Sequence, residues 1–122
     1  MHVIPIRITA DAMCFDQADY HTQADESFAL KITNSAFTRS GEPLRATVVI
    51  SRSDNPARAS DPERPHIWYY SADRLIFRAP PVEAPATNTV TVPALESGDY
   101  LLQLEPGWDY QSNAALVVRQ GR

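Results

Sequence analysis

Cysteine and lysine are the scarcest features of this 122-residue sequence, which contains one of each, Cys14 and Lys31. A single cysteine excludes an internal disulfide, and the apolar neighbours Met13 and Phe15 are typical of a buried free thiol. The other basic residues are arginines, dispersed along the chain, and the net charge is −4. Because nucleic-acid binding depends on clustered positive charge, we expect no nucleic-acid partner.

Long hydrophobic runs are also missing. No apolar stretch approaches the roughly 20 residues that cross a bilayer as a helix. The first eight residues do not combine a charged region with a long apolar segment, so they do not resemble a signal peptide. The sequence therefore predicts no membrane partner and a location in the cytoplasm or in a virion.

Catalytic motifs are absent as well. There is no Gly-x-Ser-x-Gly elbow and no glycine-rich phosphate loop. Cys14 and His21 are where the nucleophile and base of a small, unrecognised enzyme would be sought. However, Cys14 has apolar neighbours and no third group is identifiable that would orient the histidine. We expect that the protein is not an enzyme.

Metal ligands do not occur in a recognisable pattern. Electron-transfer copper domains are also small β-sandwiches, and their sites need two histidines, a cysteine and usually a weak methionine. The histidines here are His2, His21 and His66, and Cys14 lies early, far from the late loop that carries the ligands in that family. No Cys or His pair has zinc-ligand spacing. The sequence predicts neither a metal nor another cofactor.

Calcium deserves a separate test because acidic side chains gather in two predicted loops. Neither loop matches a defined calcium-binding sequence, so we interpret these residues as solvated side chains. The first group is Asp16, Asp19, Asp25 and Glu26, and the second is Asp54, Asn55, Asp61 and Glu63.

What the sequence does contain is a series of short segments in which apolar and polar residues alternate, as in half-buried strands. Ten prolines and other turn residues separate them, and Pro5 indicates an edge strand. Asp16–Glu26 has no apolar face and is expected to be a loop. The expected strands are Val3–Thr9, Ser27–Asn34, Leu44–Arg52, Ile67–Tyr70, Leu75–Arg78, Thr87–Val92, Asp99–Glu105 and Ala114–Arg119. Seven or eight strands over residues 1–122 predict one all-β domain, an antiparallel Greek-key sandwich.

A turn that delivers a tyrosine to a late strand sharpens this prediction. Leu95-Glu96-Ser97-Gly98-Asp99-Tyr100 resembles the tyrosine corner of immunoglobulin-like and fibronectin-type-III-like domains. The resemblance covers residues 87–119 and implies that the Tyr100 hydroxyl bonds an upstream backbone group. Leu102 stands where antibody domains carry the second cysteine of their bridge, so antibody-like function is not implied.

Aromatic residues are the remaining lead to a function. Successive side chains of a strand point to opposite faces, so the segment around Trp68 and Tyr70 places large rings on both. Together with Trp108 and Tyr110, these rings are candidate contact residues for a protein interface. They could equally stack on sugar rings, or a loop could cover them within the monomer.

We therefore expect a non-catalytic structural or assembly module that packs against copies of itself or a larger scaffold. A homo-oligomer, or a decoration or accessory protein of a phage particle, is its most concrete form. The alternative is a carbohydrate-binding accessory module that uses the same four aromatic residues. A small enzyme with an unrecognised site is the third hypothesis.

Overall fold

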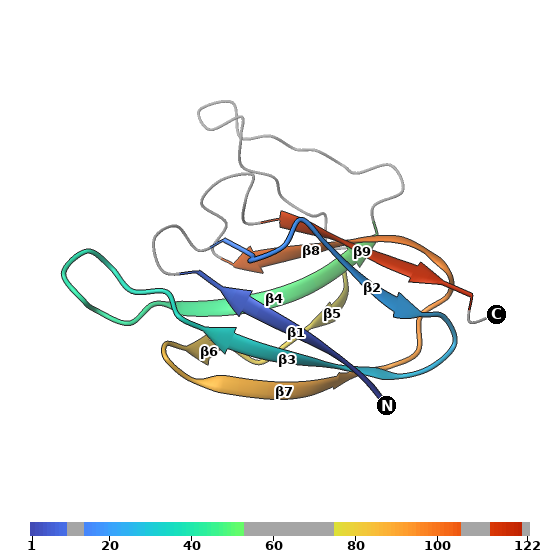
Figure 1. Cartoon of the computed structure of the whole chain (residues 1–122), viewed down its shortest axis with the longest axis horizontal. Coiled ribbons are helices and arrows are strands. Elements are labelled where there is room, and N and C mark those ends of the chain that lie inside the picture. The colour runs from blue at the N-terminus through green and yellow to red at the C-terminus, as the bar shows by residue number, and fades with distance from the viewer. Residues whose placement is uncertain (10–13, 53–74, 106–112, 121–122) are drawn as a thin grey trace, which may run out of the picture.

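Two β-sheets packed face to face form the molecule (Figure 1). The computed structural model describes residues 1–9, 14–52, 75–105 and 113–120, and no helix occurs in these ranges. An all-β sandwich is therefore confirmed. The described strands are β1 (His2–Ile8), β2 (Asp19–Gln23), β3 (Phe28–Asn34), β4 (Arg45–Arg52), β5 (Leu75–Arg78), β6 (Val82–Glu83), β7 (Thr87–Val92), β8 (Gly98–Glu105) and β9 (Asn113–Arg119).

The sheets are mixed, so the prediction of a purely antiparallel sandwich is wrong. One sheet has the order β1-β3-β7 and the other β2-β9-β8-β4-β5, with β6 beside β4. The β1–β3 and β2–β9 pairs are parallel, whereas the remaining pairs are antiparallel. The parallel pairing of β1 with β3 arises because successive strands reverse direction while β2, between them in sequence, lies in the other sheet. Its flanking strands β1 and β3 run the same way and become neighbours.

The strand β2 occupies a segment that we expected to be a loop. Its side chains alternate between exposed and buried, with Tyr20 3% and Thr22 7% exposed. Only one of these inward positions carries a strongly apolar side chain, and the residues around them are polar. The alternation is therefore too weak to identify the strand from its sequence, and pairing with β9 is what defines it.

Alternating apolar side chains from both sheets fill the core between the layers. In β1, for example, Ile4, Ile6 and Ile8 are at most 3% exposed while the residues between them face solvent. The prediction from Pro5 that this strand is an edge is confirmed. Other fully buried core side chains are Phe28, Leu30, Ile32, Val48, Ile50, Leu102 and Leu116.

Prolines interrupt one side of β4. The short strands β5 and β6 both lie along β4, and Ala79 continues the pairing by donating its N–H to the carbonyl of Val48 at 2.9 Å. Pro80 and Pro81 follow, and proline has no N–H to donate to a ladder. The strand resumes at Val82 with only two residues.

A buried asparagine ties together three segments at one end of the sandwich. The side chain of Asn34 is fully buried at the end of β3. Its Nδ2 donates to the carbonyls of Leu44, at 2.9 Å, and Val82, at 2.7 Å, and its Oδ1 accepts the N–H of Ala36 at 2.9 Å. One side chain thus satisfies buried backbone groups from the β3–β4 connection and from β6.

A tyrosine–carboxylate contact fixes the approach of the chain to β2. The Tyr20 hydroxyl donates to Asp16 Oδ1 at 2.6 Å, and the same oxygen accepts the backbone N–H of Arg7 at 3.0 Å. The Asp16 N–H in turn donates to the Arg7 carbonyl at 3.0 Å, so both backbone groups of Arg7 on the outer side of β1 are bonded. The Tyr20 ring packs edge-on against Phe15, with ring centroids 6.1 Å apart.

At the turn before β8, the Tyr100 hydroxyl donates to the carbonyl of Glu96 at 2.7 Å. The Tyr100 side chain is 6% exposed and belongs to the core. The tyrosine turn is present, but the strands around it are not all antiparallel, as the two parallel pairs show. A local hydrogen bond of this kind therefore does not specify the strand order. In the described part of the chain there is no helix long and apolar enough to cross a membrane.

Replacing Asn34 tests how far the sandwich depends on that buried amide. We expect Asn34→Ala to lower the free energy of unfolding by about 2–4 kcal/mol, because the Leu44 and Val82 carbonyls and the Ala36 N–H each lose a hydrogen bond, and the Leu44 carbonyl keeps only that from the Ala84 N–H. Urea denaturation followed by circular dichroism measures this. The matched control is Asn88→Ala on β7, whose side chain is exposed and whose loss should cost less than about 0.5 kcal/mol. Equal effects of the two variants would contradict the assignment.

Alkaline titration tests the Tyr20–Asp16 contact. Burial, followed by the hydrogen bond to Asp16 and its negative charge, raises the pKa of Tyr20 well above its usual value of 10.0. Between the unfolded and the folded pKa, the folded state holds more protons than the unfolded state, so this contribution to stability is complete below about pH 10 and is lost as pH rises above it.

We therefore expect the free energy of unfolding of the native protein to fall more steeply above about pH 10 than that of Tyr20→Phe. At neutral pH the variant should already be less stable by about 1.5–3 kcal/mol, the range for a hydrogen bond to a charged group. Urea titrations of both proteins at several pH values measure the difference between their free energies of unfolding. Contributions from other titrating groups are common to both proteins and cancel in that difference. Parallel pH profiles would show that Tyr20 does not hold its proton more tightly when folded.

Candidate functional site

An open cleft lies where the edge strands β1 and β2 of the two sheets approach each other. Its volume is about 180 Å³. The side of the cleft that belongs to β1 comes from the start of that strand, and the other side comes from β2 and the residues before it. The lining residues are His2, Val3, Ile4, Pro5, Gln17, Tyr20 and His21. The cleft is thus lined by two histidines that are 19 positions apart in the sequence.

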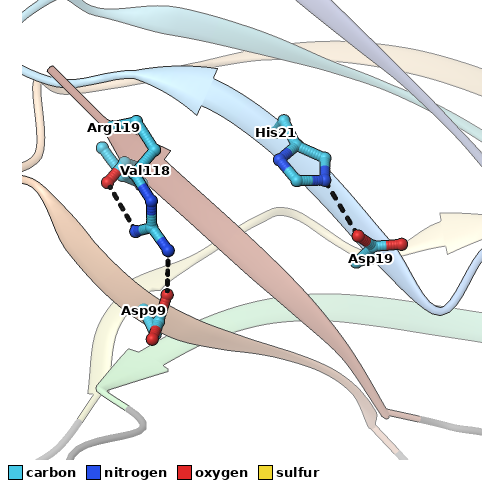
Figure 2. Close-up of polar contacts among 5 residues, drawn as sticks. All are labelled: Asp19, His21, Asp99, Val118 and Arg119. Atoms are coloured by element: carbon cyan, nitrogen blue, oxygen red, sulfur yellow. Dashed lines mark hydrogen bonds and ion pairs between the residues drawn. The ribbon is translucent and has the colours of Figure 1, made fainter.

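The two imidazoles are each held through Nε2. His2 Nε2 lies 3.2 Å from the backbone carbonyl oxygen of His21, and His21 Nε2 lies 2.8 Å from Asp19 Oδ2 (Figure 2). A carbonyl or a carboxylate can only accept a hydrogen bond, so Nε2 carries the hydrogen in each ring. In the neutral form of each histidine, Nδ1 therefore keeps its lone pair.

The neighbouring outer face of β2, β9 and β8 carries a second ion pair. Arg119 Nη2 lies 3.2 Å from Asp99 Oδ1, and Arg119 Nη1 donates to the carbonyl of Val118 at 3.3 Å (Figure 2). The side chains of His21 and Asp19 are 65% and 57% exposed. Ion pairs this exposed contribute little to stability.

Tyr20 forms the buried wall of the cleft and is not a reactive group. Its hydroxyl is bonded to Asp16, and burial moves its pKa, already well above neutral, further upward. A protonated phenol bonded to a carboxylate is a structural donor. Tyr20 therefore lines the cleft as an uncharged side chain.

The structure places the two members of the proposed thiol–imidazole pair in different surroundings. Cys14 is 8% exposed and lies beside Phe15, which bridges to Ile8 of β1. The ring of His21 is largely exposed and its Nε2 is bonded to Asp19. A buried sulfur and a solvent-facing ring are poorly placed to act as nucleophile and base, so the described geometry gives no support to an enzyme centred on these two residues.

The first acidic group also forms no cation site. Asp16 is engaged by Tyr20 and Arg7, Asp19 pairs with His21, and the Asp25 N–H donates to the Leu95 carbonyl at 2.9 Å. Within the described ranges, no group of three or more His, Cys, Asp or Glu side chains is arranged to hold a metal ion. The second acidic group, Asp54 to Glu63, lies outside the described residues.

The four aromatic residues that we predicted to contact a partner, Trp68, Tyr70, Trp108 and Tyr110, also lie outside the described residues. A protein partner, either a second copy or a larger scaffold, thus stays a prediction. What sequence reasoning missed is the cleft. Neither His2, in an apolar segment, nor His21, in a polar one, signals it locally, and only the assignment of β1 and β2 to opposite sheets makes both line one cleft.

Comparison with known proteins gives a likeness of fold only. No protein-family model and no curated protein matches the chain. Solved structures do match. Reduced auracyanin from Roseiflexus castenholzii superposes with a TM-score of 0.69 and 12% identity, covering 97% of each chain. Auracyanin A, a "blue" copper protein from Chloroflexus aurantiacus, gives 0.68 and 21% identity over 95% of this chain and 97% of that one.

An azurin from Methylomonas sp. strain J matches as well, with a TM-score of 0.64 and 11% identity over 96% of this chain and 97% of that one. These matches overturn the immunoglobulin-like and fibronectin-type-III-like assignment, because a short tyrosine turn is shared by sandwiches of different strand order. They equally overturn the hypothesis of a phage-particle module, which rested on analogy with that assignment, and the alternative of a sugar-binding module. The chain has a mixed-sheet, cupredoxin-like β-sandwich fold.

Proposed function

We propose that this chain uses a cupredoxin-like sandwich as a non-catalytic binding domain and does not carry electrons through a blue copper centre. The observation that carries the proposal is that residues 106–112, the connection between β8 and β9, contain no Cys, His or Met. Fold alone does not decide function, since the same scaffold can host different sites. The residues of this chain therefore have to be compared with the donors that copper requires.

A blue-copper electron-transfer site needs two imidazoles and one thiolate around the metal, with a weak axial ligand such as methionine. The late connection, between β8 and β9, reads Pro-Gly-Trp-Asp-Tyr-Gln-Ser over residues 106–112 and contains no Cys, His or Met. Leu104, near the end of β8 and just before this connection, is a buried core residue whose side chain has no metal-binding atom. This connection cannot supply a thiolate or an imidazole.

The thiol that the chain does possess lies elsewhere. Cys14 is buried in the segment between β1 and β2, and the residues beside it close the edge of the sandwich through the Ile8–Phe15 bridge. The described histidines, His2 and His21, are on exposed positions of these two strands. The donor set therefore does not fit a blue copper site, and we derive no electron-transfer step from the fold.

A non-catalytic role agrees with the remaining chemistry of the described residues. Tyr20 is held protonated and Cys14 is shielded from solvent. The cleft between β1 and β2 is open and lined by both apolar and polar side chains, which suits the binding of a ligand.

A copper titration tests this proposal directly. We expect that adding Cu(II) to the purified protein produces no intense blue charge-transfer band, because no thiolate is available to the metal. Visible absorption and cyclic voltammetry measure the outcome, with an azurin reconstituted in parallel as the positive control. A blue band that disappears in Cys14→Ser, or a reversible copper wave that disappears with it, would sink the proposal.

A further inference from the structure

The strand β7 presents a sheet edge without the features that normally keep strands from pairing with other chains. It is the last strand of the β1-β3-β7 sheet and lies at the outer margin of the molecule (Figure 1). Its sequence, Thr-Asn-Thr-Val-Thr-Val, contains no charge and no proline, and it pairs with β3 without a register shift. Pro85 and Pro93 lie outside it on either side. A regular, uncharged edge strand is a template for pairing with another strand.

The other edges that the described strands form do carry such features. On β1, Pro5 has no N–H to donate, and Asp16 bonds both backbone groups of Arg7. The edge of β2 accepts the hydrogen bond from the His2 ring. The strand β5 ends at the charged Arg78, and two prolines follow shortly after it. Among these edges, β7 is therefore the one left open.

The backbone groups that point outward from β7 belong to its threonines. The Asn34 N–H donates to the carbonyl of Ala86 at 3.0 Å, so every second residue after Ala86 bonds to β3. The residues between them direct both N–H and C=O away from β3, and no strand in the described ranges pairs with that side. These outward residues, whose side chains are all exposed, are Thr87, Thr89 and Thr91.

We propose that β7 pairs antiparallel with β7 of a second copy of this chain, about a two-fold axis at Thr89. Such an axis places Thr89 opposite its own copy and Thr87 opposite Thr91. Each threonine then exchanges both backbone bonds with a threonine of the other copy. The side chains suit this pairing as well, since Thr33 Oγ1 and Thr87 Oγ1 already lie 3.1 Å apart across β3 and β7. Cross-strand threonine pairs of this kind stabilise a sheet.

The charge near the axis permits the pairing. The position facing itself across the axis is the neutral Thr89, whose neighbour on β3 is Lys31. The two copies of Lys31 are then three strand spacings apart, which is about 14 Å. This distance exceeds the Debye length of roughly 8 Å at physiological ionic strength, so their repulsion is largely screened.

The pairing closes at two copies. The opposite edge of the same sheet is β1, where Pro5 and the bonds between Asp16 and Arg7 prevent a further strand from continuing the ladder. A two-fold contact uses the same surface of both copies and leaves none for a third. One strand pair is small beside stable interfaces of roughly 1,200–2,000 Å², so the dimer is weak and concentration-dependent.

Sedimentation equilibrium of the full chain, over a series up to millimolar concentration, tests the dimer. We expect a single monomer–dimer equilibrium. Thr89→Lys and Thr89→Glu should each weaken it by at least about tenfold, because like charges then lie directly opposite each other at the axis. Mixing equal amounts of the two variants should restore dimerisation, because position 89 then faces the opposite charge. This rescue depends on the two-fold axis and not on the stability of either variant.

The matched control is Val3→Lys, which adds the same charge to an exposed position on the same face of the sheet but at its β1 edge. It should leave the dimerisation constant unchanged. Circular dichroism and thermal unfolding check that each variant is folded. A monomer at every concentration, a mass that grows beyond the dimer, or folded charge variants that do not associate on mixing would overturn the proposal. So would equal weakening by Val3→Lys and Thr89→Lys.

The inference goes beyond the proposed function, because β7 is not part of the cleft between β1 and β2. The sedimentation experiment contains no copper. Its outcome is therefore separate from that of the copper titration, and either proposal can fail without the other.

Discussion

The placement of β2 in the sheet opposite β1 and β3 is the constraint on which the rest of this structure depends. Tyr20 secures it by burying its ring against Phe15 and donating its hydroxyl to Asp16. Backbone bonds at both ends of β2 continue the pairing with β9, from Ala115 to Ala18 and from Ala24 to Arg119. Because β2 crosses over, β1 and β3 meet in parallel, and so do β2 and β9.

The same crossing creates the candidate site. A strand that stayed beside β1 would pair its backbone with it and leave no cleft. Here the two edges face each other from different sheets, and a hydrogen bond from the His2 ring to the His21 carbonyl spans them. Asp16 bonds both backbone groups of Arg7, which covers part of the free edge of β1. Unpaired edges invite association with other chains, and the bonds to Arg7 cover part of this one.

The comparison with copper proteins illustrates how far a scaffold is independent of its site. Auracyanins and an azurin share the arrangement of strands with this chain at 11–21% identity. The hydrophobic core requires only apolar side chains of suitable volume at alternating positions, and many sequences satisfy that requirement. A copper site requires particular donor atoms converging on one point, and the sequence between β8 and β9 does not contain them.

Much of the fold could be predicted from the sequence because alternation of apolar residues is a local property. Val3–Thr9, Ser27–Asn34 and Leu44–Arg52 were expected as strands within a residue or two of their bounds in β1, β3 and β4. The segment Asp19–Gln23 was missed, since it carries one strongly apolar side chain and is a strand only through β9.

The sequence by itself indicated an all-β sandwich, and it places no Cys, His or Met in residues 106–112. Tertiary structure alone decided which strands are neighbours, the two parallel pairs, and the meeting of His2 with His21. The physical reason is range: residue alternation specifies which side of a strand is buried, whereas pairing and site geometry depend on contacts between segments far apart in the chain.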